Sequence, residues 1–392
     1  MLNDAEFAAW FRLLETPGLG RGAVRRLLAA CGSPQAVLAA PPATLRELVG
    51  AAGCQALCAW PPLFAERLAA AQAWRAASAH HHVMVLGDAA WPPALLQTAD
   101  PPLLLYVHGN PGVLARPSLA IVGSRQATAQ GKDNARAFAQ ALGTQGYVVV
   151  SGLAQGIDAA AHEGALASAA GTIAVVGTGL DRSYPPRHAE LAARIAAHGA
   201  VVSEYAPGMP PLPEHFPQRN RIIAGLTQGT LVVEAALRSG SLITARLASE
   251  AGREVFAVPG SIHAPQAKGC HALLKQGAKL VESAEDILEE LLGPAAPRQG
   301  SLALNAADET DETRDSGAGS GAGEIRGVPA ATGAAAGDPL LQALGPDPVT
   351  LDALLARTGW STPELLARLL DFELAGQVAR LPGGLYQRRF TG

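Results

Sequence analysis

The chain of 392 residues is poor in cysteine, and its cysteines form neither a metal-binding nor a disulfide pattern. The four stand at positions 31, 54, 58 and 270, and no two show Cys-x-x-Cys spacing. This pattern predicts free, mostly buried thiols in a reducing compartment. The consecutive histidines at 80–82 lie between an expected helix and an expected strand, where a solvated turn explains them better than metal binding. We therefore expect no metal and no cofactor.

Long hydrophobic runs are also missing. No window approaches the ~18 consecutive apolar residues of a membrane helix. The first residues lack the basic-then-apolar order of a secretory signal. We expect a cytoplasmic protein with no membrane partner.

A strong excess of charge of either sign is absent as well. The formal net charge is −4, from 30 basic and 34 acidic residues. The segment 293–338 holds seven acids and three arginines, and seven minus three accounts for the whole deficit of four. The remaining chain is close to neutral, which permits a basic binding face without requiring one.

The short motifs that commonly carry catalysis are not present. The sequence has no Gly-x-Ser-x-Gly elbow, no Walker loop and no metal triad. The turn at 177–182 has Arg182 where a dinucleotide fingerprint needs its third glycine, which argues against a nicotinamide cofactor. Asp158 and His162 stand four residues apart on one expected helix. We interpret Asp158 as a helix-start residue and His162 as packed beneath a loop, in preference to an acid–base pair.

The sequence does contain a repeated pattern of apolar strand, glycine-containing turn and alanine-rich helix. Strands are expected at 119–122, 147–150, 173–176, 201–204, 231–234 and 255–258, after two short apolar runs at 83–86 and 103–107. Helices are expected to begin near Ala129, Asp158, His188, Pro217 and Ser241. This alternation predicts an α/β, Rossmann-like parallel sheet covered on both faces. Its strand ends should meet at one edge, where such folds bind ligands.

The stretch 215–260 concentrates groups that suit a phosphate. Arg219, Asn220 and Arg221 stand where a helix is expected to begin, and Ser239-Gly240-Ser241 opens a second helix. Free N–H groups at helix starts bind anions, and guanidinium groups grip phosphate with a planar fork of donors. The alternative is a solvated helix start whose arginines pair with Glu214 or Glu234.

Smaller domains are expected on both sides of the core. Residues 1–78 read as a helical domain of SAM or helix-hairpin-helix type, with a Pro-Gly-Leu-Gly turn between two helices. The core spans 79–292, and a Gly-, Ala- and acid-rich disordered linker is expected at 293–337. Three short helical patterns and a hairpin predict a winged helix at 338–392. Its expected recognition helix carries Glu364, Arg368 and Asp371, which suits duplex DNA poorly, so a protein-binding or regulatory role fits at least as well as DNA reading.

A series of long motifs runs from residue 119 to about residue 290. They are IVGSR (121–125), SGLAQGIDAAAH (151–162), GTGLDRSYP (177–185), SEY (203–205), FPQRNRIIAGL (216–226), EAALRSGSLITA (234–245), FAVPG (256–260) and KGCHALLKQGA (268–278). In order and spacing, this series resembles the DNA-processing protein A family, also called DprA or Smf. The family's closing motif often reads Lys-Gly-x-Asn, and here His271 takes the last place.

The resemblance implies a Rossmann-like core that binds single-stranded DNA without catalysis and loads the recombinase RecA during natural transformation. It implies a homodimer, and RecA and single-strand-binding protein as further partners. With the expected strand ends, it gives as DNA-binding residues Gly123, Ser124, Arg125, Arg187, Arg219, Asn220, Arg221, Ser239, Gly240, Ser241 and Lys268. The expected dimer contacts are Leu273, Leu274 and Leu280.

One enzymatic alternative shares this kind of core. Nucleotide phosphoribohydrolases carry a Pro-Gly-Gly-x-Gly-Thr motif followed by a glutamate. Here Gly229-Thr230, Glu234 and Pro259-Gly260 supply the elements, but they are not assembled into one motif. We interpret Glu234 as a partner for Arg219 or Arg221 instead.

Overall fold

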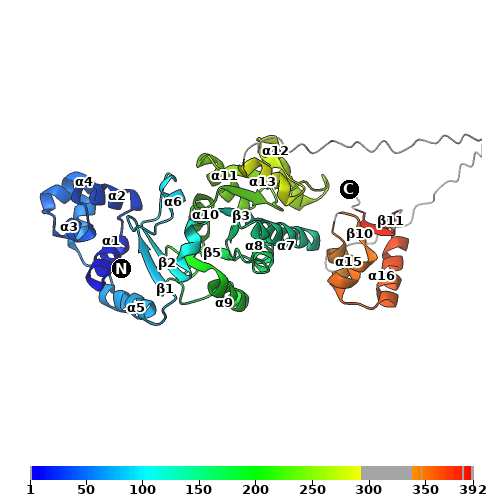
Figure 1. The fold of residues 1–392 in the computed structure, drawn as a ribbon, viewed down its shortest axis with the longest axis horizontal. Coiled ribbons are helices and arrows are strands. Elements are labelled where there is room, and N and C mark those ends of the chain that lie inside the picture. Colours follow the sequence, from blue (N-terminus) through cyan, green and yellow to red (C-terminus); the bar gives the residue numbers. More distant parts are fainter. Residues whose placement is uncertain (1, 293–337, 346, 382–383, 390–392) are drawn as a thin grey trace, which may run out of the picture.

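The computed structural model describes residues 2–292, 338–345, 347–381 and 384–389 (Figure 1). The linker expected at 293–337 lies outside these residues. The described chain forms an N-terminal group of helices, a central sheet with helices on both faces, and a small C-terminal unit. No helix in the described ranges is long and apolar enough to cross a membrane.

The central sheet has nine strands in the order β1-β2-β6-β5-β4-β3-β7-β8-β9. Neighbours from β6 through β9 pair in parallel, which confirms the predicted Rossmann-like core. The apolar runs expected near 83 and 103 form β1 and β2, which extend one edge by antiparallel pairing. The strand bounds are β1 (His81–Val85), β2 (Leu104–Gly109), β3 (Ser118–Val122), β4 (Val148–Ser151), β5 (Thr172–Val176), β6 (Ala200–Ser203), β7 (Gly229–Val232), β8 (Glu254–Ala257) and β9 (Lys279–Leu280).

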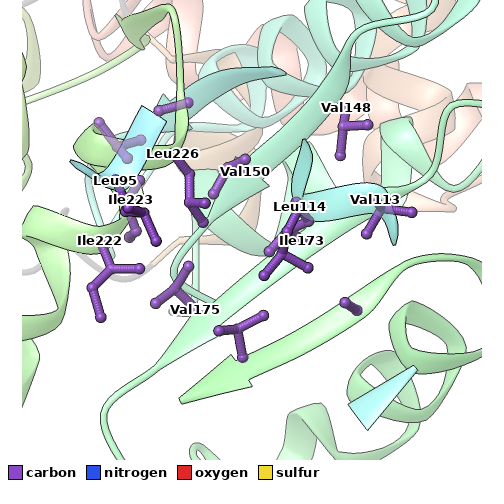
Figure 2. Close-up of a cluster of buried hydrophobic side chains, with 14 of the residues drawn as sticks. Leu95, Val113, Leu114, Val148, Val150, Ile173, Val175, Ile222, Ile223 and Leu226 are labelled. Atoms are coloured by element: carbon purple, nitrogen blue, oxygen red, sulfur yellow. The ribbon is translucent and has the colours of Figure 1, made fainter. Parts of the chain in front are cut away.

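Alternating side chains of the strands build two hydrophobic layers. On β3, Leu119 and Ile121 pack in one layer and Ala120 and Val122 in the other, because successive side chains of a strand point to opposite faces. Each fully buried leucine or isoleucine stabilises the fold by about 1.5–3 kcal/mol. The first layer packs against α7 (Ala129–Thr144), α8 (Ile157–Ala165) and α13 (Ala284–Leu292). The second, shown in Figure 2, packs against α6 (Pro93–Leu96), α10 (His215–Leu226), α11 (Ser241–Glu250) and α12 (Lys268–Lys275).

The N-terminal helices share a core with the sheet edge. Phe7, Trp10 and Leu13 recur at helical spacing and are buried in this core together with Leu104 and Tyr106 of β2. The predicted Pro-Gly-Leu-Gly turn separates the first two helices. The bounds are α1 (Asp4–Glu15), α2 (Arg21–Cys31), α3 (Pro34–Ala39), α4 (Pro42–Cys58) and α5 (Phe64–Ala76), and α9 (Ala189–His198) covers β5 and β6.

A network of charged groups joins these helices to the core. Arg21 and Arg25 of α2 donate to the carboxylate of Asp100, at 2.7 and 2.6 Å. Arg221 of α10 donates to Glu204 at 2.5 Å and lies 3.3 Å from Asp100. Arg21 also lies 3.5 Å from Glu204. Five charges from four separate segments therefore meet at one place.

The C-terminal unit is a winged helix, as predicted. Its small sheet has the order β10-β12-β11. Arg357 contacts the core, where its guanidinium donates to Gln130 at 2.8 Å and to Asp133 at 2.9 Å, both on α7. The bounds are α14 (Pro339–Leu344), β10 (Val349–Thr350), α15 (Leu351–Thr358), α16 (Thr362–Leu374), β11 (Val378–Leu381) and β12 (Leu385–Arg388).

Candidate functional site

An open cavity of about 750 Å³ lies at the carboxyl ends of the parallel strands. Its walls come from the loops after β3, β4, β5 and β7 and from the starts of α10 and α11. This is the edge at which doubly wound sheets bind ligands. Eight of the predicted site residues line it: Gly123, Ser124, Arg125, Arg219, Asn220, Ser239, Gly240 and Ser241.

Arg219 brings a buried guanidinium to the cavity wall. Only 5% of the residue is exposed, and its side chain donates to the carbonyl oxygen of Val175. A Cβ atom at position 152 would lie 2.1 Å from the guanidinium, so Gly152 is needed for this close approach. Burial lowers the pKa of Arg219 to about 10; Asp158 opposes this shift, and the charge of Arg125 adds to it. Arg219 is therefore charged at neutral pH, and the two neighbouring cations favour an anion between them.

Asp158 and His162 of α8 are held by structural contacts. The Asp158 carboxylate accepts hydrogen bonds from the N–H groups of Gly152 (3.1 Å) and Ala154 (3.3 Å), and burial raises the pKa of this carboxyl. His162 is fully buried, with Nδ1 2.8 Å from the hydroxyl of Thr172. Asp158 lies in the first turn of α8, as expected from the sequence, and it shapes the loop after β4.

An aromatic pair forms one side of the cavity. The rings of Tyr184 and Phe216 lie 5.3 Å apart, centroid to centroid, with 39° between their planes. The guanidinium carbon of Arg125 lies 5.9 Å from the centroid of Phe216. Arg125 and Tyr184 are exposed, so their groups are accessible to a ligand. Exposed aromatic faces stack on nucleobases, and arginine adds a cation–π contribution. No local pattern in the sequence marks this pair, although Tyr184 stands in the GTGLDRSYP motif and Phe216 in the FPQRNRIIAGL motif.

The helix starts at the cavity differ in part from expectation. α10 begins at His215, four residues before Arg219, so its arginines lie one turn inside the helix. Serine hydroxyl groups gather at the start of α11, where the Ser239 and Ser241 oxygens lie 2.7 Å apart. The amide of Asn220 donates to the carbonyl oxygen of Gly240 at 3.4 Å and ties the two helices together. The start of α11 therefore brings serine hydroxyl groups to the cavity, and the start of α10 brings Phe216.

Three of the predicted DNA-binding residues do not line the cavity. Arg221 points to Glu204 and Asp100, and only 11% of its side chain is exposed. Neither Glu214 nor Glu234 is its partner, in contrast to both alternatives raised by the sequence. Arg187 lies exposed in a 3-10 turn, and Lys268 is the exposed first residue of α12.

Glu234 does not pair with either arginine, which corrects the sequence interpretation. Its carboxylate accepts hydrogen bonds from the N–H and hydroxyl groups of Thr128, the N-cap residue of α7. Burial raises the pKa of this carboxyl, while the bonds from Thr128 lower it. The carboxylate is committed to the start of α7 and is not among the groups that line the cavity.

Separate family models match the core and the C-terminal unit. A family model described as DNA recombination-mediator protein A matches residues 82–292. The chain belongs to this family. A model of the DprA winged helix domain matches residues 326–384. The recombination-mediator span contains every loop that lines the cavity.

Relatives of the family match over much of their length. Protein Smf of Escherichia coli K12 is 42% identical over 316 residues, which cover 79% of this chain and 78% of that protein. DNA processing protein DprA of Streptococcus pneumoniae R6 is 50% identical over 203 residues, which cover 52% of this chain and 72% of that protein. The X-ray structure of DprA from Streptococcus pneumoniae aligns with a TM-score of 0.64 and 37% identity, over 74% of this chain and 98% of that one.

Proposed function

We propose that the chain binds single-stranded DNA in the cavity and delivers it to the recombinase RecA, with no chemistry of its own. The observation that carries this proposal is the meeting of Arg125, Arg219 and the rings of Tyr184 and Phe216 around one open cavity. Membership in a family described as recombination mediators supports the same role.

The chemistry of the cavity favours a single strand over a duplex. A single strand offers phosphates and free base faces together, whereas the base faces of a duplex are stacked inside the helix. The two arginines and the hydroxyl groups of Ser239 and Ser241 suit phosphates. Tyr184 and Phe216 suit the faces of unstacked bases, whatever their identity. Binding should therefore be insensitive to sequence.

The candidate catalytic groups support delivery over hydrolysis. The Glu234 carboxylate is bonded to Thr128, the Asp158 carboxylate to backbone N–H groups, and His162 is buried. A phosphoribohydrolase needs a carboxylate aimed at the glycosidic carbon of a bound nucleotide. Among the described residues, the carboxylate that lines the cavity is Asp158, and the backbone N–H groups of Gly152 and Ala154 hold it.

Delivery to a recombinase also suits a two-fold dimer. β9 is the last strand in the sheet order, and Leu280 on it is 55% exposed. Leu273 and Leu274 lie on α12, the helix that precedes β9 in the chain, and are half-buried. An exposed apolar sheet edge needs a cover, and a second copy provides one.

We propose that Arg187 and Lys268 contact the DNA strand outside the cavity.

Binding is tested by fluorescence anisotropy with single-stranded and duplex oligonucleotides over a range of salt. Arg125→Ala should weaken single-strand binding about tenfold, the effect of losing one charge-assisted hydrogen bond. It should also flatten the log–log salt slope by about 0.7 for the lost phosphate contact. Lys268→Ala should act in the same direction. Arg246→Ala is the control, because this exposed arginine of α11 does not line the cavity. Unchanged affinity and slope in both test variants would refute the site.

Delivery is tested by RecA assembly on strands coated with single-strand-binding protein, beside an assay for base release from nucleoside monophosphates. The protein should accelerate assembly and release no base. Glu234→Gln should leave assembly intact. Base release that Glu234→Gln abolishes would contradict the proposal.

A further inference from the structure

Glu234 lies two residues beyond the end of β7 and makes contacts at both ends of the loop that carries Arg125. At one end, its backbone carbonyl oxygen accepts a hydrogen bond from the N–H of Ser124 at 2.7 Å. At the other end, its carboxylate accepts from the N–H of Thr128 at 2.9 Å and from the hydroxyl of the same residue. One residue therefore ties both ends of the segment 124–128.

Glu234 packs closely against the backbone of two glycines. A Cβ atom at Gly123 would lie 2.8 Å from the Glu234 carbonyl oxygen. A Cβ atom at Gly131 would lie 2.3 Å from its carboxyl carbon. Real Cβ contacts are not this short, so glycine at both positions lets the loop and α7 close around Glu234. The Thr128 hydroxyl completes the arrangement by accepting from the N–H of Gly131 at 2.9 Å.

Among the described residues, no hydrogen bond or ion pair tethers the Arg125 side chain. Its side chain is exposed and lies over the ring of Phe216. The hydrogen bonds next to it belong to Ser124. The carbonyl oxygen of Ser124 accepts from Ile157 N–H at 3.2 Å, and its hydroxyl accepts from Gln126 N–H at 3.1 Å. The backbone that aims Arg125 into the cavity thus depends on the ends of its loop.

We infer that Glu234 is a positioning residue for Arg125 in DNA binding. It does not touch the strand; it holds the 124–128 loop in the binding conformation before the strand arrives. A loop held in this way loses less conformational entropy on binding, and the gain appears as affinity. This inference rests on the proposed function, because it assumes that Arg125 contacts the strand.

The test is a double-mutant cycle with Arg125→Ala and Glu234→Ala, read as single-strand affinity in the full chain. In the parent, Arg125→Ala should weaken single-strand binding about tenfold. Glu234→Ala keeps the backbone bond to Ser124 but loses both bonds to Thr128. In this background Arg125→Ala should weaken binding less than about threefold, because the Thr128 end of the loop is no longer held. Glu234→Gln keeps an oxygen that accepts from Thr128, and it should restore most of the coupling.

The control for general destabilisation is Ser118→Ala. Ser118 begins β3 at the opposite end of the strand, and its buried hydroxyl donates to the carbonyl oxygen of Leu226 at 2.9 Å. This variant loses a buried hydrogen bond, but in its background Arg125→Ala should still weaken single-strand binding about tenfold. Amide hydrogen exchange in the 124–128 loop should rise in Glu234→Ala and not in Ser118→Ala. If Glu234→Ala does not fold, Thr128→Val removes the hydroxyl contact and takes its place in the cycle.

The outcomes separate the inference from the proposed function. An Arg125→Ala variant with unchanged affinity in the parent would overturn both. A tenfold loss that is fully additive with Glu234→Ala would overturn only the positioning role. Coupling that appears equally with Ser118→Ala would also overturn it, because the effect would then be general.

Discussion

Protonation of His162 should destabilise the core as the pH falls. Thr172 donates its only hydroxyl proton to the carbonyl oxygen of Val149 at 2.6 Å, so towards His162 the hydroxyl acts as an acceptor. The histidine Nδ1 therefore carries the proton of the neutral ring. Its Nε2 is buried without a hydrogen-bond partner among the described residues. A second proton at Nε2 would create a buried charge with nothing to solvate it.

The size of the effect follows from the pKa. Burial lowers the pKa of His162 from 6.5 to about 3, and the charges of Arg219 and His188 add to the shift. The unfolded chain takes up this proton at higher pH than the folded chain does. The stability that neutral His162 contributes is therefore fully present above pH 6.5 and is lost as the pH falls towards the folded value. By pH ~5 the loss is about 2 kcal/mol, since each pH unit below the unfolded pKa costs ~1.4 kcal/mol.

The perturbation is His162→Asn, whose side-chain amide can donate to Thr172 as Nδ1 does. Urea unfolding followed by far-UV circular dichroism, at pH ~7.5 and ~5, gives the change in stability for each protein. The parent should lose about 2 kcal/mol more than the variant, because all other titrating groups are shared. His198→Asn is the matched control, since the His198 side chain is exposed to solvent. Equal pH dependence in the parent and His162→Asn would refute the reasoning.

Two further predictions concern association. The full chain should form a dimer at micromolar concentrations in light scattering, because Leu280 leaves an exposed apolar side chain on the edge strand β9; a monomer would contradict the proposed edge contact. Arg357→Ala should loosen the winged helix from α7 and raise hydrogen exchange at the α7 start about tenfold, since it removes charge-assisted bonds to Asp133. Arg368→Ala, an exposed residue of α16, is the control and should change nothing; an equal rise there would refute the contact.

The sheet could be predicted from the sequence because its strands are continuous apolar runs of strand length separated by glycine turns. Burial on both faces produces such runs, and the alternation with helices implies parallel pairing. The pairing of β1 and β2 could not be predicted in the same way. Their apolar runs stand before the repeating pattern, and nothing local distinguishes an antiparallel edge from a separate hairpin.

The site was only partly predictable, since its contacts join residues far apart in the chain. Arg219 and Arg221 look alike in the sequence, but two residues turn a helix by about 200°, so they face opposite ways. The start of α10 was expected near Pro217 but lies at His215, so the sequence did not define which arginine faces the cavity. Glu234 could not be assigned to Thr128 because 106 positions separate them, and no local pattern marks that pair.

The ion network around Arg221 changes how mutant phenotypes at this motif should be read. A mutational screen for lost function would find substitutions of Arg219 and Arg221 together and attribute both to binding. Arg221, however, lies among Asp100, Glu204 and Arg21, at the junction between the N-terminal helices and the core. Its loss would leave two carboxylates short of a cation, and the defect would be one of assembly. Substitutions at these two nearby positions would then give the same phenotype for different reasons, lost binding at Arg219 and lost assembly at Arg221. Protein abundance in the cell would tell them apart.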